Sequence, residues 1–203
     1  MKTLTILVTG GIGSGKSAVC AHYSSLGIPV YDSDSRTKAL YGKSLRLAAN
    51  VNAAFGGDLL TGDGVLDRAK LAERAFASDE ALRRLEALVH PAVLEDFRDW
   101  REAAGSEVVI LESAIASSLP SFMSEVDRVL LVCADERTRI CRAMLRDGCD
   151  EQALAQRIRR QEEKLPAALR APDAVIQNDA SLEELYAQAD RALRELVKGH
   201  GGI

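Results

Sequence analysis

Residues 4–18 read LTILVTGGIGSGKSA and join a short apolar run to a glycine-rich turn. The run from Leu4 to Val8 is rich in aliphatic and β-branched residues, which is typical of a buried strand. The next residues complete the spacing G-x-x-x-x-G-K-[ST] between Gly10 and Ser17. This stretch therefore predicts a strand, a phosphate-binding loop and a helix in immediate succession.

The residue types of the turn suit the binding of phosphate groups. Its glycines lack a Cβ, so the backbone can adopt positive φ angles and direct N–H groups at an anion. A helix that begins near Lys16 adds the positive end of its dipole at the same point. We expect Lys16 to reach the β- and γ-phosphates of a nucleotide and the Ser17 hydroxyl to ligate Mg²⁺. The expected cofactor-binding residues here are Gly11, Gly13, Ser14, Gly15, Lys16, Ser17 and Ala18.

Two other interpretations of the turn agree less well with the sequence. A chance glycine-rich turn does not need a strand before it, a helix after it and the complete motif spacing. A dinucleotide-binding loop requires G-x-G-x-x-G, and this pattern fails at its sixth place from Gly11 and from Gly13. The sequence therefore argues against NAD as a cofactor.

The composition of the 203-residue chain, 47% hydrophobic and 28% charged, predicts one globular domain with modest insertions. A net charge of −4 argues against a nucleic-acid-binding surface, which needs a basic face. No signal-peptide pattern is visible, and no apolar segment approaches the roughly 20 residues that span a bilayer. We expect a cytoplasmic protein without a nucleic-acid, membrane or obligate protein partner.

Two aspartates follow the second predicted strand. Residues 16–26 are expected to form a helix and residues 28–31 a buried strand, which gives an α/β unit. Asp32 and Asp34 come directly after this strand, and ligands of open α/β sheets bind at the carboxyl ends of strands. Alternatively, these residues cap the helix that follows.

A helical insertion is predicted between the second and third strands. Residues 44–55, 67–77 and 78–104 have mostly helical periodicity. His90-Pro91 interrupts the last of these segments, and Pro91 is expected to kink the helix and so fix the direction of His90. A histidine at a kink can be structural or functional.

The third strand is predicted over Val108–Glu112 and ends in a carboxylate. In phosphate-loop proteins such an acid commonly helps to hold Mg²⁺, so Glu112 and Ser17 are the candidate metal residues. An ordinary surface acid at a strand end is the alternative. Further strands are expected at residues 129–132 and 172–176, and a terminal helix after Ser181.

Basic residues gather after the fourth strand. On a predicted helical hairpin they suggest a lid whose guanidinium groups stabilise a transferring phosphoryl group. Interleaved acids leave a solvated, ion-paired hairpin as the alternative. Asn178, after the last strand, can read a base edge or form a turn. The basic residues are Arg137, Arg139, Arg142, Arg146, Arg157, Arg159, Arg160 and Lys164.

These parts together predict phosphoryl transfer. The reaction needs a phosphate cradle, a metal ion, positive charge on the γ-phosphoryl group and a group that orients the attacking hydroxyl. An acid at Asp32 or Asp34 can accept the hydroxyl proton as a general base. A kinase is therefore expected rather than a simple nucleotide hydrolase, and the absence of an Asn-Lys-x-Asp signature argues against a GTPase.

The order and spacing of several segments resemble the dephospho-coenzyme A kinases over essentially the whole chain. The resemblance implies ATP-dependent phosphorylation of the ribose 3′-hydroxyl of dephospho-coenzyme A. It also implies a three-layer α/β P-loop kinase fold with a five-stranded parallel sheet. The core would comprise residues 1–34, 105–135 and 168–203, the substrate-binding insertion about 35–104 and the lid about 136–167. The segments are TGGIGSGKS (9–17), LGIPVYDSD (26–34), LVHP (88–91), 142–147 and DAVIQN (173–178).

The resemblance also implies roles for individual residues. Asp34 matches the catalytic base and Asp32 its companion, both at the acceptor. His90 matches a histidine of the substrate domain, and Glu112 lies on the acceptor side. In the lid and at the nucleotide, Arg142 matches a catalytic arginine, Arg146 a second phosphate contact and Asn178 an adenine-side position.

The chain departs from the family pattern at two places. Most members have Asp, then Pro-Leu-Leu and a later Glu, where this chain has ESAIAS at residues 112–117; Ala18 replaces the common threonine of the loop. Another small-molecule kinase, such as a nucleoside monophosphate or shikimate kinase, is a rival interpretation. A non-enzymatic regulator that responds to ATP is the second.

Overall fold

The computed structural model describes residues 2–148, 154–155, 158 and 171–198. Its central element is a five-stranded parallel sheet with the order β2-β3-β1-β4-β5, which confirms the predicted fold class. The apolar run that opens the chain forms the middle strand, whose six residues are all buried. The strands are β1 (Leu4–Thr9), β2 (Val30–Asp32), β3 (Val108–Glu112), β4 (Arg128–Cys133) and β5 (Ala174–Gln177).

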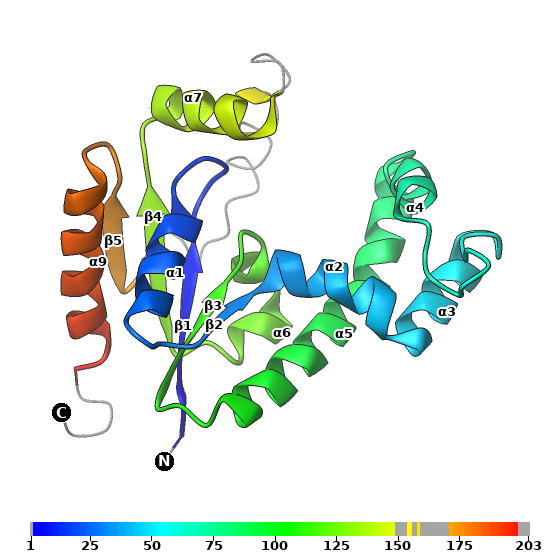
Figure 1. Ribbon diagram of the computed structural model, residues 1–203, viewed down its shortest axis with the longest axis horizontal. Helices are drawn as coiled ribbons and strands as arrows, with labels where there is room; N and C mark the ends of the chain where they lie inside the picture. The colour runs from blue at the N-terminus through cyan, green and yellow to red at the C-terminus, as the bar shows by residue number, and fades with distance from the viewer. Residues whose placement is uncertain (1, 149–153, 156–157, 159–170, 199–203) are drawn as a thin grey trace. The chain divides into compact units, whose positions relative to one another are not determined.

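Two helices pack side by side against one face of this sheet (Figure 1). They are α1 (Lys16–Ser25) and α9 (Leu182–Leu196). Val19 and Tyr23 of α1 are fully buried in a core that also contains Leu185 and Ala189 of α9. The Tyr23 hydroxyl donates a hydrogen bond of 2.9 Å to the Ala189 carbonyl, which satisfies the one polar group that this contact buries on Tyr23.

Shorter elements complete the sheet-bearing part of the chain. A 3₁₀ turn, η1 (Ala116–Ser118), and a short helix, α6 (Pro120–Met123), connect β3 to β4. Helix α7 (Glu136–Asp147) follows β4 and ends at Gly148, whose φ of 62° suits a glycine. The second half of the predicted hairpin lies outside the described residues, except for Leu154, residue 155 and Ile158.

By its contacts the chain divides into two compact units, Met1–Tyr31 with Ala104–Ile203, and Asp32–Ala103. The second unit is helical. Arg36 binds Asp96 through two hydrogen bonds of 2.8 and 2.7 Å, which join the first and last of its helices. The helices are α2 (Ser33–Lys43), α3 (Leu45–Ala54), α4 (Arg68–Ala75) and α5 (Asp79–Ala104).

The periodicity of the sequence predicted most of these helices, with differences of a few residues at their ends. Helix α5 runs through Pro91 as one element of 26 residues, so the proline does not end it. Leu26 and Leu182 are 54% and 56% exposed, because Leu26 follows the last residue of α1 and Leu182 is the first of α9.

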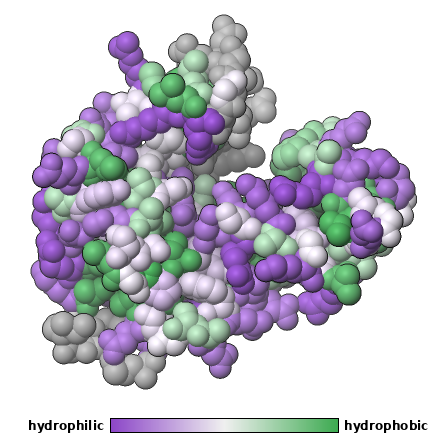
Figure 2. Space-filling model, viewed as in Figure 1, coloured by the Kyte–Doolittle hydropathy of each residue, from purple (hydrophilic) through white to green (hydrophobic). Residues whose placement is uncertain are grey.

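The surface agrees with the charged composition of the chain. Figure 2 shows hydrophilic side chains over most of the visible face, with hydrophobic side chains in separate groups. Among the described residues, no helix combines the length and hydropathy needed to cross a membrane.

Candidate active site

The loop between β1 and α1 has the backbone conformation that its glycines permit. Gly13 has a φ of 75°, and Gly15, the residue before α1, has a φ of 97°. Both values lie in the left-handed region, which other residues rarely adopt. A Cβ at Gly13 would also collide with the backbone of Arg139, and a Cβ at Gly15 with the amide of Asn178. These two glycines are therefore required both by the loop conformation and by close neighbours.

The polar groups of the loop are arranged around its own backbone. The Lys16 ammonium group donates hydrogen bonds to the carbonyl oxygens of Gly10 (2.8 Å) and Gly11 (3.2 Å). The Ser14 hydroxyl is buried, with the residue 1% exposed, and has no hydrogen-bond partner among the described residues. A buried hydroxyl without a partner is costly unless a further group satisfies it. Nucleotide phosphate oxygens fit this hydroxyl, the positive end of α1 and the Lys16 ammonium.

The predicted metal residues meet at the neighbouring strand end. Glu112 pairs with Val8 in the parallel ladder, so its side chain lies beside the start of the loop. The Ser17 hydroxyl donates a hydrogen bond of 2.7 Å to Glu112 Oε1. Among the described residues, no three His, Cys, Asp or Glu side chains gather as a metal site. This oxygen pair fits Mg²⁺, which takes one or two protein oxygens and completes its shell with phosphates and water.

Arg142 and Asn178 meet at the far side of the same loop. The Arg142 guanidinium donates to the Asn178 carbonyl oxygen at 2.9 Å, and its second nitrogen lies 3.5 Å from Asn178 Oδ1. The Asn178 amide nitrogen donates to the Ser14 carbonyl oxygen at 2.8 Å. Asn178 therefore contacts the loop directly at Ser14, and Arg142 contacts Asn178.

Helix α7 packs onto the loop through a small apolar cluster. Ile12 of the loop and Ile140 pack against buried Ala143, together with Leu154 and Ile158. Arg146 is exposed near the end of α7. The predicted lid residues Arg157, Arg159, Arg160 and Lys164 lie outside the described residues. The first half of the predicted lid is therefore a helix that packs against the phosphate loop.

Asp32 caps helix α2 in the second unit. It accepts hydrogen bonds from the backbone N–H groups of Asp34 (3.0 Å) and Ser35 (3.1 Å) and from the Ser35 hydroxyl (2.5 Å). The capping alternative is thus observed for Asp32. Asp34 lies in the first turn of α2 with an exposed side chain, free of any capping task. The two aspartates therefore differ in structural role: the Asp32 carboxylate caps α2, and the Asp34 carboxylate is exposed without capping it.

His90 lies half-buried in the middle of helix α5. Burial disfavours the imidazolium form and lowers the pKa of His90 below its ordinary value of 6.5, an effect that nearby Glu86 partly offsets. His90 is therefore an imidazole whose neutral form is favoured near neutral pH.

Sequence reasoning missed the contacts on the outer side of the loop. The approach of the Arg139 backbone to Gly13 and the bond from Asn178 to Ser14 join residues more than 100 positions apart. No spacing or periodicity reports such pairs. The only available signal was the glycine at each position, which the phosphate-binding motif already explained.

A parallel sheet with this loop after its central strand, a lysine in the loop and an oxygen pair beside it defines the class of P-loop kinases. A solved shikimate kinase from Bacteroides thetaiotaomicron shares the fold, with a TM-score of 0.57 and 19% identity over 96% of this chain and 98% of that one. The family model described as dephospho-CoA kinase matches residues 4–184. The chain belongs to the dephospho-CoA kinase family.

Individual relatives agree with this family. A dephospho-CoA kinase from Porphyromonas gingivalis is 41% identical over 175 residues, which cover 86% of each chain. One from Geobacillus kaustophilus is 37% identical over 198 residues, 95% of this chain and 96% of the relative. The crystal structure of TT1252 from Thermus thermophilus has a TM-score of 0.80 and 30% identity, over 98% of this chain and 100% of that one. The family catalyses the final step of coenzyme A biosynthesis by phosphorylating dephospho-CoA, with ATP as phosphate donor.

Proposed function

We propose that this protein transfers the γ-phosphoryl group of ATP to the ribose 3′-hydroxyl of dephospho-CoA, giving CoA and ADP, with Mg²⁺ bound at Ser17 and Glu112. The observation that carries the proposal is the loop of residues 10–17, with its buried Ser14 hydroxyl, the Lys16 ammonium and the Ser17–Glu112 pair at 2.7 Å. We also propose a cytoplasmic location for this protein.

On the nucleotide side, each proposed role follows from charge. Lys16 and the N-terminus of α1 hold the phosphates, and the bound metal ion would neutralise charge between the β- and γ-phosphates. Arg142 and Arg146 of α7 would supply positive charge where negative charge develops on the phosphate oxygens during transfer. Residues 136–167 would act as the lid that excludes water from the reaction.

On the acceptor side, we assign the substrate to the second unit. Asp34 would accept the proton of the 3′-hydroxyl as that oxygen attacks the γ-phosphorus, and Asp32 would hold the start of α2 in place. His90, whose neutral form is favoured, would act as a hydrogen-bonding group toward the acceptor rather than as a positive charge.

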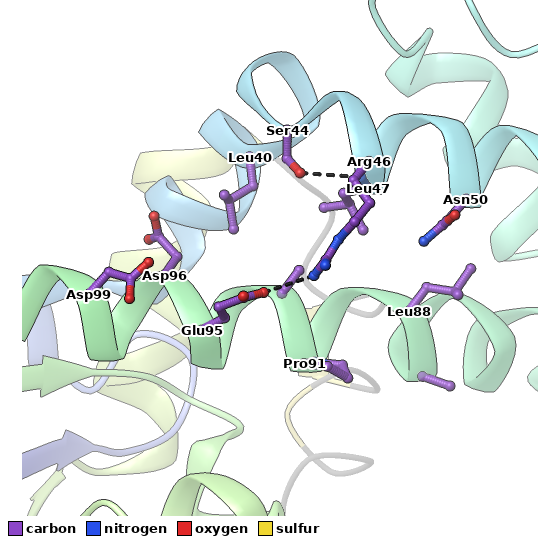
Figure 3. Close-up of a pocket in the computed structure, with 12 residues that line it drawn as sticks. Leu40, Ser44, Arg46, Leu47, Asn50, Leu88, Pro91, Glu95, Asp96 and Asp99 are labelled. Carbon is purple, nitrogen blue, oxygen red and sulfur yellow. Dashed lines mark hydrogen bonds and ion pairs between the residues drawn. The ribbon is translucent and has the colours of Figure 1, made fainter.

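A pocket within the second unit fits the uncharged part of the acceptor. It has a volume of about 490 Å³ and lies between α2, α3 and α5 (Figure 3). Leu40, Leu47 and Leu88 supply apolar wall, and Asp96 and Asp99 lie together on α5. Asp96 is paired with Arg36, and Glu95 of the lining is paired with Arg46. Because most of the charge in this lining is thus compensated and its wall is partly apolar, we assign the amide-bearing pantetheine arm of dephospho-CoA to this pocket.

A parallel acceptor assay tests the proposed function. ATP is offered with dephospho-CoA, AMP or shikimate, and ADP release is followed by a coupled reaction. We expect only dephospho-CoA to accelerate ADP release. Acceleration by AMP or shikimate instead would contradict the proposal, and ATP binding without turnover on any acceptor would favour a regulator.

A further inference from the structure

The side chain of Asn178 is buried at the end of β5 and directed at the phosphate loop. Its residue is 5% exposed, and its amide nitrogen donates to the carbonyl oxygen of Ser14 at 2.8 Å. A buried polar side chain that bonds a main-chain carbonyl restricts the conformation of that backbone segment. Asn178, which is not part of the loop between β1 and α1, therefore restricts the conformation of that loop at Ser14.

The partners of this amide determine its orientation. The Ser14 carbonyl can only accept a hydrogen bond, so the NH₂ end of Asn178 faces it. Arg142 can only donate, and its guanidinium lies at the opposite end, 3.5 Å from Asn178 Oδ1. The two ends cannot be exchanged without placing donor against donor and acceptor against acceptor.

The strand end that carries Asn178 is itself held in place. The backbone N–H of Asn178 donates to the Cys133 carbonyl at 2.8 Å. The next residue, Asp179, accepts a hydrogen bond of 2.7 Å from the Asp135 backbone N–H, and this bond contributes most to a lowered pKa of the Asp179 carboxyl. Asn178 thus projects from a segment tied to the end of β4, which makes it a rigid support.

The bond to Ser14 has a consequence for the next peptide group. Across a trans peptide bond the C=O of Ser14 and the N–H of Gly15 point in opposite directions. Holding the carbonyl toward Asn178 therefore turns the Gly15 N–H away from Asn178. The contact also requires glycine at position 15, because a Cβ there would collide with the Asn178 amide.

We propose that Asn178 is a positioning residue of the phosphate loop, which fixes the Ser14–Gly15 peptide so that the Gly15 N–H is directed at a nucleotide phosphate. Arg142 holds the other end of its amide and links this support to helix α7. The inference rests on the proposed binding of ATP. It differs from a contact with adenine, because the amide is already committed to Ser14 and Arg142.

Binding measurements separate the two roles. We would compare the wild type, Asn178→Ala and Asn178→Asp by calorimetry, with tripolyphosphate, ATP and GTP in the presence of Mg²⁺. Loss of one buried hydrogen bond that orients the loop should weaken tripolyphosphate and ATP binding by the same factor, about tenfold. The ratio of ATP to GTP affinity should stay unchanged. Asn178→Asp keeps the side-chain size but places a carboxylate oxygen against the Ser14 carbonyl oxygen. It should therefore weaken the binding of tripolyphosphate and of ATP at least as much as Asn178→Ala does.

Gln188→Ala is the matched control. The Gln188 amide also makes two main-chain hydrogen bonds, to the N–H (3.1 Å) and C=O (2.9 Å) of Gln177, but it does not contact the loop. It should bind tripolyphosphate and ATP like the wild type. Unchanged tripolyphosphate binding in Asn178→Ala, with or without weaker ATP binding, would overturn the proposal. These binding measurements contain no acceptor. If the protein failed to phosphorylate dephospho-CoA, that failure would count against the proposed function but would not change the conclusion about Asn178.

Discussion

At the level of single residues, the chemistry proposed for the nucleotide site could be inferred from the sequence because most of its residues lie in one short motif. Lys16 and Ser17 follow the glycines directly, and Glu112 was identifiable as the acid that ends a buried strand. The support that Asn178 gives to Ser14 was not predictable, since it depends on how the end of β5, which pairs with β4, approaches the loop after β1 in the folded sheet. An asparagine after a strand is compatible with many roles.

Asp34 allows a direct test of the proposed base. Asp34→Asn keeps the size of the side chain and leaves the cap of α2 intact, because Asp32 bonds the backbone N–H of residue 34. Removing a general base should lower kcat by about 10²- to 10⁴-fold with the Kd of ATP unchanged. Single-turnover phosphotransfer and calorimetry measure the two quantities. Wild-type turnover in Asp34→Asn would count against a catalytic role.

His90 should make stability depend on pH. Its folded-state pKa lies below the ordinary value of 6.5, so the unfolded chain binds a proton more readily than the folded protein. The stabilising contribution is therefore complete above about pH 6.5 and is lost as the pH falls toward the lower folded-state pKa. Urea unfolding at pH 7 and pH 5 should show a smaller decrease for His90→Gln than for the wild type. Equal decreases would contradict this account.

At the level of elements, periodicity predicted the helices well and their ends less well. Apolar spacing locates the buried face of a helix such as α9, whose Leu185, Ala189 and Leu196 are buried. Apolar spacing does not show where the first and last turns of a helix extend beyond the core, and Leu26 and Leu182 at helix ends are exposed. Residues 78–104 were expected to be mostly helical with a kink at Pro91, and α5 does run through Pro91 as one helix.

Asp32 tests whether a cap also has a functional charge. Asp32→Ala removes the cap of α2 and should lower the free energy of unfolding by about 1 kcal/mol. Asp32→Asn can still cap, so it should melt like the wild type. If the carboxylate also assists the acceptor, turnover should fall in both variants. Full activity in Asp32→Asn would assign this residue to capping alone.

The pocket between α2, α3 and α5 gives a test of acceptor binding. Ala92 is half-buried in its lining, so Ala92→Trp should fill part of the roughly 490 Å³. We expect the KM for dephospho-CoA to rise about tenfold, through loss of contacts to the pantetheine arm, while the KM for ATP stays the same. Steady-state kinetics with each substrate varied in turn measures both constants.

The matched control is Phe76→Trp, at a position that is 75% exposed and does not line the pocket. It should leave both KM values unchanged. An unchanged KM for dephospho-CoA in Ala92→Trp would place the arm elsewhere.

At the level of the whole molecule, the sequence motif and the strand order carry most of the fold. A phosphate loop after the first strand and an insertion after the second are visible in the residue pattern, and the resemblance to the kinase family implied the five-stranded parallel sheet that is observed. Long-range contacts escape this reasoning. The packing of α7 on Gly13 and Ile12 arises from residues that only the folded chain brings together.

The central claim is that phosphate moves from ATP to one particular hydroxyl. Incubation with γ-³²P-labelled ATP and dephospho-CoA, followed by isolation of the labelled product and assignment of the phosphorylated carbon by NMR, tests it most directly. We expect the label in CoA at the ribose 3′-oxygen, and none of it there with Asp34→Asn over the same time. Label found only in inorganic phosphate, or on another hydroxyl, would contradict the account.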